Sequence, residues 1–390
     1  MPEKWQHMVD GAVALRRDLH RRPEVAWNER ETARTLREEL SKAGIDWRPC
    51  AGTGTVATLA GDAEGRHVAL RADIDAMPIS EATGVPWASQ HEGIMHACGH
   101  DGHTASLFAA AWWLKRYEDE LPGPVTLLFQ PAEEGGHGAL RMIEDGCLAG
   151  VDEIFGWHNW PGIAYGRAIC PDGPVMAANG TFHVWVTGRG GHASQPEDCR
   201  DPVLAASAIT MALQQVVSRR MPAQQAAVVS VTSIEAPSPE TVIPDVAYVG
   251  GSIRIGDTAQ RELVGELITR VAQDTARAYG VTADVELRPR YGATINHPKQ
   301  AEQLRWALGE EFGQAWHSTA TLVPLMASED FSYYLAEVPG AFALLGSDDG
   351  KGYGIPCHSP RYDFNDRLIS HVARVFARVA GAPVPPGPAG

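Results

Sequence analysis

The residues His96–His103 carry the densest group of metal-binding side chains in the sequence. Three histidines, one cysteine and one aspartate stand within eight residues, separated by two glycines. Imidazole and thiolate ligands this close together suit a transition metal such as Zn²⁺, Mn²⁺, Co²⁺ or Ni²⁺. An apolar helical run, 104–113, follows directly. Cys98 and His100 are therefore expected in a loop at a helix N-terminus, where the helix dipole favours a thiolate.

Further candidate ligands follow short apolar strands. Four such strands each deliver an acidic or histidine side chain at their end or in the loop that follows. These side chains are Asp75 at the end of 67–75, Glu134 after 125–130, His158 after 153–157 and His358 after 341–346. Strands that alternate with helices predict an α/β fold, a mostly parallel sheet with helices on both faces. Because ligands bind beyond the carboxyl ends of parallel strands, we expect these side chains to converge.

The candidate metal ligands are Cys98, His100, Glu134, His158 and His358. Five ligands are one too many for a closed tetrahedral site, so they predict two divalent metal ions that share a bridge. A divalent metal lowers the pKa of the water that it binds from ~15.7 to ~7, which makes a nucleophile near neutral pH. Glu133, beside Glu134, can act as a proton shuttle because neighbouring side chains point in different directions. The pattern predicts a metal-dependent hydrolase.

The middle of the chain has a different order of elements. Residues 178–293 show four strand patterns and two helix patterns in the order β-α-β-β-α-β, which is typical of a ferredoxin-like α+β domain. A chain of 390 residues has room for two domains. The strand that leads to His358 comes after this segment. We therefore expect a metal-binding catalytic domain made of 1–177 and 294–390, with 178–293 inserted into it.

Composition limits the partners and the location. The formal net charge of −15 argues against nucleic acid or an anionic membrane as partner. Six cysteines scattered over a long chain do not indicate a disulfide framework. The sequence shows neither a signal peptide nor a membrane-spanning stretch. We expect a cytoplasmic enzyme with a small-molecule substrate.

Four motifs resemble the M20 metallopeptidase family, in its aminoacylase, hippurate hydrolase and auxin-conjugate hydrolase branch. They are Cys98–His103, Gln130–Glu134, Gly188–Ala193 and Ser328–Phe331. The likeness covers nearly the whole chain. It implies that the five candidate ligands hold a dinuclear metal site and that Glu133 is the general base. It also implies a homodimer or higher homo-oligomer formed through the inserted domain.

The resemblance gives roles to residues that spacing alone cannot assign. It implies that His192 stabilises an oxyanion, often from the partner subunit, and that Arg254 binds the substrate carboxylate with two hydrogen bonds. It implies that Asp75 orients a metal-ligand histidine, and it places Asp73 where other branches have a metal histidine. Thr241 is a departure, since many relatives have asparagine there. A hydroxyl in place of an amide changes the donors offered to a substrate.

These features predict metal-dependent hydrolysis of the amide bond of N-acyl-L-amino acids, with an acetyl or aromatic acyl group. The products would be a free amino acid and a carboxylate. One alternative is a dipeptidase or carboxypeptidase of the same family. Another is a Cys98 thiol nucleophile with His100 as base, although two residues apart in a glycine-containing loop is a poor layout. A third is a non-catalytic metal-dependent binding protein or sensor, which would need no proton shuttle.

Overall fold

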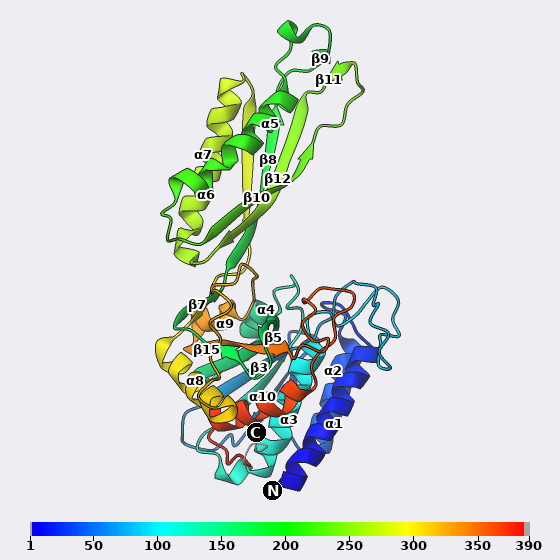
Figure 1. Ribbon diagram of the computed structural model, residues 1–390, viewed down its shortest axis with the longest axis vertical. Coiled ribbons are helices and arrows are strands. Elements are labelled where there is room, and N and C mark those ends of the chain that lie inside the picture. Colours follow the sequence, from blue (N-terminus) through cyan, green and yellow to red (C-terminus); the bar gives the residue numbers. More distant parts are fainter. Residues whose placement is uncertain (1, 386–390) are drawn as a thin grey trace. The chain divides into compact units, whose positions relative to one another are not determined.

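The computed structural model describes residues 2–385, which fall into two compact units (Figure 1). The first unit comprises Met1–Val175, Ile295–Leu322 and Asp330–Gly390, and the second comprises Met176–Thr294 and Val323–Glu329. The short segment Val323–Glu329 joins the second unit, which no sequence pattern indicated. The two ends of the expected catalytic domain, residue 1 and residues 386–390, lie outside the described residues.

The first unit is built on a seven-stranded sheet. Its strands stand in the order β1 (Trp47–Cys50), β2 (Gly54–Leu59), β4 (Val125–Gln130), β3 (Val68–Asp73), β5 (Glu153–Ala164), β15 (Gly340–Asp348) and β6 (Ala168–Ile169). The central strands β4, β3, β5 and β15 pair in parallel, and the outer pairs are antiparallel. The expected mostly parallel sheet is confirmed in this centre, where every residue of β3 and β4 is buried.

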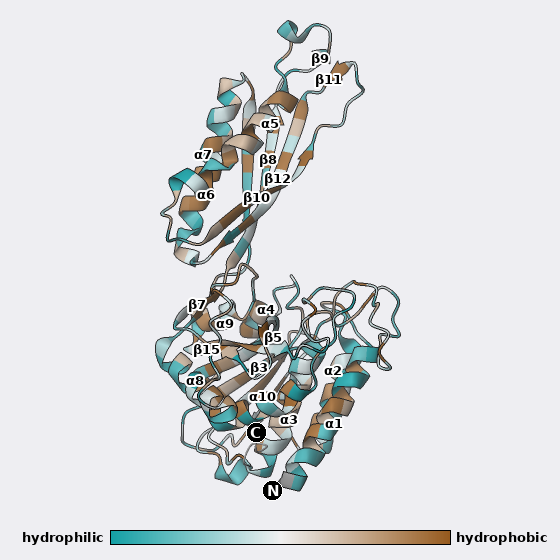
Figure 2. Cartoon of the chain, in the orientation of Figure 1, coloured by the Kyte–Doolittle hydropathy of each residue, from teal (hydrophilic) through white to brown (hydrophobic). Residues whose placement is uncertain are grey.

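Helices cover both faces of this sheet. One face packs against α1 (Pro2–Arg21), α2 (Arg30–Lys42), α3 (His100–Arg116), α8 (Pro298–Phe312) and α10 (Arg367–Val379). Leu70 and Phe155 lie in that core. The other face meets α4 (Gly138–Glu144) and α9 (Ser332–Glu337), where the rings of Phe331 and Phe342 lie 5.0 Å apart. Figure 2 shows the hydrophobic residues gathered on the strands. Alternate side chains of each strand therefore supply two separate cores.

The second unit has the expected ferredoxin-like order. Its antiparallel sheet runs β10 (Ala227–Glu235), β12 (Val246–Ile255), β8 (Ala178–Thr187) and β13 (Thr282–Pro289), and it packs against α5 (Pro202–Leu213), α6 (Gln215–Arg220) and α7 (Arg261–Ala278). The first of the two expected helix patterns forms two helices, α5 and α6, which meet at Gln214. Asp201 caps α5 by accepting hydrogen bonds from the Val203 and Leu204 amides.

Short elements complete the chain. Two-stranded ladders join β7 (Gly173–Met176) to β14 (Thr294–Asn296) and β9 (Gly191–His192) to β11 (Val242–Ile243), and 3₁₀ turns cover Glu118–Glu120, Pro196–Asp198 and Thr258–Gln260. Within residues 2–385, no helix combines the length and the apolar character needed to cross a membrane. The cytoplasmic location stays a prediction.

A buried ion network joins α1 to α3. The His20 ring lies 2.8 Å from Asp101 Oδ2, and Arg16 Nε lies 3.3 Å from the same oxygen. All three side chains are buried. Burial alone would lower the pKa of His20, but the Asp101 carboxylate outweighs burial and raises this pKa to about 9. Charged His20 therefore stabilises the contact between the two helices.

This raised pKa predicts a pH-dependent stability. The contribution of charged His20 is complete below its unfolded pKa of about 6.5 and is lost as the pH rises through about 9. We expect the free energy of unfolding to fall by up to about 3 kcal/mol across that window. Urea denaturation at several pH values would measure it. His20→Gln should flatten the slope, and equal slopes for the two proteins would contradict this assignment.

Candidate metal centre

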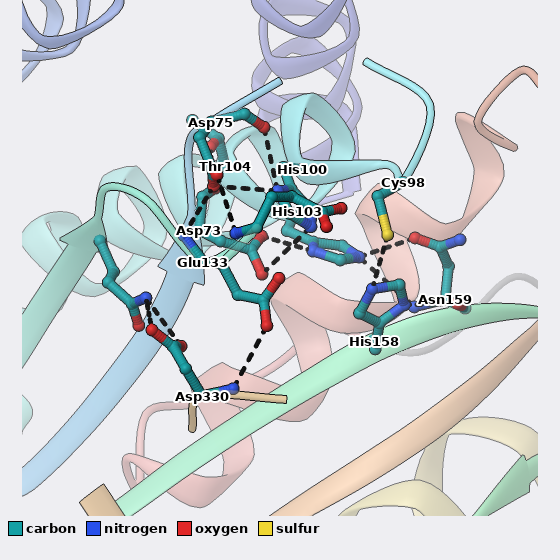
Figure 3. A network of polar contacts seen from close by, with 12 residues as sticks. Asp73, Asp75, Cys98, His100, His103, Thr104, Glu133, His158, Asn159 and Asp330 are labelled. Carbon is teal, nitrogen blue, oxygen red and sulfur yellow. Dashed lines mark hydrogen bonds and ion pairs between the residues drawn. The ribbon is translucent and has the colours of Figure 1, made fainter. Parts of the chain in front are cut away.

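The structure brings the five expected metal ligands into two overlapping groups. The ligand atoms of Cys98, His100 and His158 lie within 4.8 Å of one another, and so do those of Cys98, Glu134 and His358. Figure 3 shows Cys98 and His158 pointing toward each other. His158 lies inside β5, because the strand continues to Ala164, so the expected strand end before His158 was wrong. Cys98 belongs to both groups, so the arrangement fits two neighbouring metal ions with one shared thiolate ligand.

Two of the histidines have their rings fixed for metal binding. His100 Nδ1 lies 3.0 Å from the main-chain oxygen of Asp75, and His158 Nδ1 lies 2.6 Å from that of Asn159. A carbonyl oxygen can only accept, so Nδ1 donates in both rings and Nε2 is left for a metal. Within residues 2–385, the buried His100 Nε2 has no hydrogen-bond partner. A buried nitrogen in this state fits a metal ligand.

The backbone around His100 differs from the expected loop. Cys98 lies in the turn, but His100 is the first residue of α3. Gly99, between them, has a φ of 98°, and a Cβ atom at this position would collide with the Asn159 side chain. Glycine is therefore required here both for the left-handed backbone and for the close approach of β5. The expected loop position of His100 was wrong because the helix starts earlier than its apolar run.

The two adjacent glutamates separate into different environments. Glu134 Oε1 lies 3.2 Å from His358 Nε2, whereas Glu133 Oε1 accepts a hydrogen bond of 3.2 Å from the Asp330 amide. The Asp75 carboxylate accepts from the amides of both glutamates, at 3.1 and 3.0 Å. Glu133 is 7% exposed. One carboxylate therefore faces a candidate ligand, while the other is held beside it by a main-chain donor.

The charges of the site favour a cation. Burial alone would lower the pKa of His100, but Asp73 and Asp75 raise it well above its usual value. Burial and the nearby His103 lower the pKa of His158, which keeps that ring neutral. The acidic surroundings of His100 therefore select a positive charge, which divalent metal ions would supply.

Cys98 is a thiol unless a cation binds. A hydrogen bond with the Cys357 side chain, burial and the Glu134 carboxylate all raise the pKa of Cys98 well above its usual range. The expected stabilisation of a thiolate by the helix dipole is outweighed by these groups. A metal ion would reverse this balance, because metal binding deprotonates a thiol. The same raised pKa disfavours the alternative in which Cys98 attacks the substrate.

A second set of polar residues supports the site through contacts that no sequence pattern predicted. His103 lies between Asp73 Oδ1, at 2.6 Å, and Asn159 Oδ1, at 2.7 Å. Asp73 also accepts a hydrogen bond of 2.8 Å from Arg71. The Asp73 carboxylate thus has two partners within the protein, the His103 ring and the Arg71 guanidinium. The usable signal was the spacing of His100 and His103, because residues three apart are neighbours on a helix.

Three expected site residues belong to the second unit. His192 lies exposed on β9, and the amide of Ala193 donates to the Thr241 oxygen at 2.9 Å, so His192 and Thr241 are close neighbours. Arg254 pairs with Asn179 at the far end of β12 and donates to Ser328 Oγ at 2.5 Å. Within this unit, the residues expected to bind substrate therefore lie in two different places: His192 and Thr241 at the small β9–β11 ladder, and Arg254 near the end of β12 in the four-stranded sheet (Figure 1).

Residues 69–382 match the family model of Peptidase family M20/M25/M40. This chain belongs to that family. An N-acetyl-L-cysteine deacetylase of Bacillus subtilis is 40% identical over 358 residues, which cover 92% of this chain and 84% of the relative. An IAA-amino acid hydrolase of Arabidopsis thaliana is 39% identical over 387 residues, which cover 97% and 86% of the two chains. The resemblance found in the sequence is thereby confirmed.

A solved structure supports the metal content of this M20 protein. The crystal structure of a Bacillus subtilis dinuclear metal binding peptidase from the M20 family superposes with a TM-score of 0.83 at 33% identity and covers 96% of this chain and 98% of its own. Together with the clustered ligands, it confirms two divalent metal ions per subunit. The M20 protein is a metal-dependent amidohydrolase.

The overlap of the two ligand groups predicts unequal effects of mutation on metal content. Cys98→Ala should lower the binding of both metal ions, because Cys98 is the ligand that the groups share. His158→Ala and His358→Ala should each lower the binding of one metal ion and leave about one equivalent. Metal analysis after gel filtration would measure this. Cys170→Ala is the control, because it removes a buried thiol that contacts the Ala301 main-chain oxygen of α8, and it should keep both metal ions. A Cys98→Ala protein with unchanged metal content would refute the shared ligand.

Proposed function

We propose that this M20 protein hydrolyses the amide bond of N-acyl-L-amino acids, with an acetyl or aromatic acyl group, and releases a free amino acid and a carboxylate. The observation that carries the proposal is Glu133, a buried carboxylate fixed by the Asp330 amide next to the candidate ligand Glu134. A protein that only binds metal has no need of it. The names of the two relatives, an N-acetyl-L-cysteine deacetylase and an IAA-amino acid hydrolase, support this substrate class.

Glu133 would move the protons of the reaction. Its carboxylate takes a proton from the attacking water and then gives it to the amine that leaves. When bound, divalent metal ions supply Lewis acidity, which acidifies water and polarises the acyl carbonyl. Cys98, His100, Glu134, His158 and His358 would hold them. The hydrogen bond from the Asp330 amide would hold the Glu133 carboxylate in one orientation for both proton transfers.

The second unit would supply the contacts to the substrate. We assign the amino-acid carboxylate to Arg254, because a guanidinium forms two parallel hydrogen bonds with a carboxylate. His192 would stabilise the oxyanion as a hydrogen-bond donor. Thr241, beside His192, would offer a hydroxyl to the same substrate. These three assignments rest on the resemblance to the family and on the exposed or half-buried state of the side chains.

Replacing the general base gives a direct test. Glu133→Gln should lower kcat by roughly 10²–10⁴-fold on an N-acetyl amino acid, because an amide cannot take the proton. Its metal content should stay at two equivalents, since Glu133 is not a proposed ligand. Glu144→Gln, an exposed glutamate at the end of α4, is the matched control and should retain activity. A fully metallated and fully active Glu133→Gln enzyme would rule out this mechanism.

The alternatives differ in substrate and turnover. A panel of acetyl-amino acids, benzoyl-glycine and dipeptides, compared by kcat/KM, separates an N-acyl-amino-acid hydrolase from a dipeptidase or carboxypeptidase. A metal-dependent binding protein or sensor would turn over none of them. Activity that survives metal removal would favour a Cys98 nucleophile, against the raised pKa of this thiol.

We further propose that the protein forms a homodimer through the inserted unit. Within the described residues 2–385, the unit's four-stranded sheet has β10 and β13 as its edge strands. β13 carries the charged residues Asp284, Glu286 and Arg288 and ends at Pro289, features that block pairing with another strand. β10 has no charged residue before Glu235. A second copy would fit this uncharged edge by extending the sheet.

The helix next to β10 supports the same surface. α5 contacts β10 and contains no charged residue, as the pale and brown colours of Figure 2 show. Two of its apolar side chains point outward, with Leu204 56% and Met211 73% exposed. Exposed apolar side chains beside an open strand edge form the kind of patch that partners cover.

Charges on this patch should separate the copies. We expect the wild-type protein to elute with twice the mass of one chain in gel filtration with light scattering. The double variant Leu204→Glu and Met211→Glu should elute as a monomer at low concentration, because each interface would then bury unpaired carboxylates. Leu263→Glu, a similar change at a 40%-exposed position on α7, should stay dimeric. A wild-type monomer would disprove the proposal.

A further inference from the structure

The loop that carries the two functional glutamates has an unusual backbone. Ala132, directly before Glu133, has a φ of 54°, and His137, after Glu134, has a φ of 58°. Residues other than glycine rarely adopt this left-handed conformation, and they keep it only where their surroundings hold them. The loop is also closely packed, since a Cβ atom at Gly138 would collide with the Pro131 oxygen. Some group must therefore hold the loop in place.

Two buried carboxylates hold three consecutive amides of this loop. The amides of Glu133 and Glu134 donate to Asp75, and the amide of Ala132 donates to Glu29 Oε1 at 2.9 Å. Asp75 also contacts His100, which agrees with the role that the family resemblance implies for it. Glu29 comes from a different part of the chain, just before α2, and has no role in the chemistry described so far. It secures the residue with the left-handed backbone.

Glu29 itself has one fixed orientation. Its side chain is fully buried, and its second oxygen accepts a hydrogen bond of 2.7 Å from Thr53. Its main-chain oxygen accepts from the Ala33 amide at 2.9 Å in the first turn of α2. A parallel bridge between Val25 and Ala76 places the preceding segment beside Asp75. Burial raises the pKa of Glu29 to about 7, and Asp75 adds to the rise. A charged carboxylate at this buried position would therefore be unfavourable without the hydrogen bonds from Ala132 and Thr53.

We infer that Glu29 is a positioning residue that holds the Ala132–Glu134 backbone, so that Glu133 faces the reacting water and Glu134 faces its metal ion. The inference rests on the proposed function of these two glutamates. It makes the contact between Glu29 and Ala132 necessary for both the proton shuttle and one metal ligand. Glu29 touches neither the substrate nor a metal ion in this assignment.

Three variants test the inference. Glu29→Ala removes the acceptor for the Ala132 amide, and the loss should lower kcat and the affinity for one metal ion by about 10–100-fold each, with KM little changed. Glu29→Gln should recover most of both, because its amide oxygen can accept from Ala132 and its amide nitrogen can donate to Thr53. Glu153→Ala is the control, since Glu153 is a buried carboxylate that binds Gln300 and Arg66 and not this loop.

The measurements are steady-state kinetics on an N-acetyl amino acid and Zn²⁺ affinity by competition with a coloured chelator. Full kcat and full Zn²⁺ affinity in Glu29→Ala would overturn the inference. So would a Glu29→Gln protein as impaired as Glu29→Ala, or a Glu153→Ala protein with the same losses, since these would indicate a general loss of stability. If the wild-type protein turns over no acyl-amino acid, the proposed function fails, and the Zn²⁺ affinities still decide the role of Glu29.

Discussion

The geometry of the site depends on the Asp75 carboxylate. Its two oxygens accept hydrogen bonds from the Glu133 and Glu134 amides, and it also contacts the His100 ring. The end of β3, the start of α3 and the loop after β4 therefore meet at one side chain. A buried carboxylate is tolerated only when such donors surround it, and here the donors include the main-chain amides of the proposed general base and of a candidate metal ligand. The same few hydrogen bonds stabilise the fold and orient the residues of the proposed site.

The buried charged groups around Asp75 differ in the kind of partner they have. Arg71 binds Asp73 and Asp330 on one side of the sheet, while Arg16 and His20 bind Asp101 on the other. Each of these three buried acids has a cation of the protein as partner. The candidate metal ligands Cys98 and Glu134 differ, since Cys98 Sγ faces His158 Nε2 and Glu134 Oε1 faces His358 Nε2, and both histidines are themselves candidate ligands. This contrast separates acids that support the fold from side chains that are left available to metal ions.

Much of the site was predictable because its signal is local. A short apolar strand followed by Asp75 or Glu134 indicates both the strand and the edge of the sheet where the side chain lies, and parallel pairing then brings these ends together. His158 does not follow this rule, because β5 continues beyond it to Ala164. The helix start at His100 was less visible, because its first turn is polar and the apolar pattern begins later. The role of Glu29 could not be predicted at all. Its contact with Ala132 spans 103 residues of sequence, and no spacing rule connects two such positions.

The second unit shows the same limit. Alternating strands and amphipathic helices predicted its order, yet the break at Gln214 and the contribution of Val323–Glu329 depend on packing between distant segments. Thr241 was visible as a departure from the family pattern, and the structure adds that it lies next to His192. Local patterns thus specify elements, and tertiary contacts determine where those elements end.

The position of β15 has a consequence for synthesis on the ribosome. This strand lies between β5 and β6, and it becomes available only after the long insertion has been made. Residues Met176–Thr294 form most of one compact unit, so they can fold while the first sheet still lacks an inner strand. The edge of β5 that pairs with β15 therefore stays unpaired while everything between Ala164 and Gly340, nearly half of the chain, is made. The insertion can therefore fold before the first sheet is complete, and His358 is the last of the candidate ligands to be made.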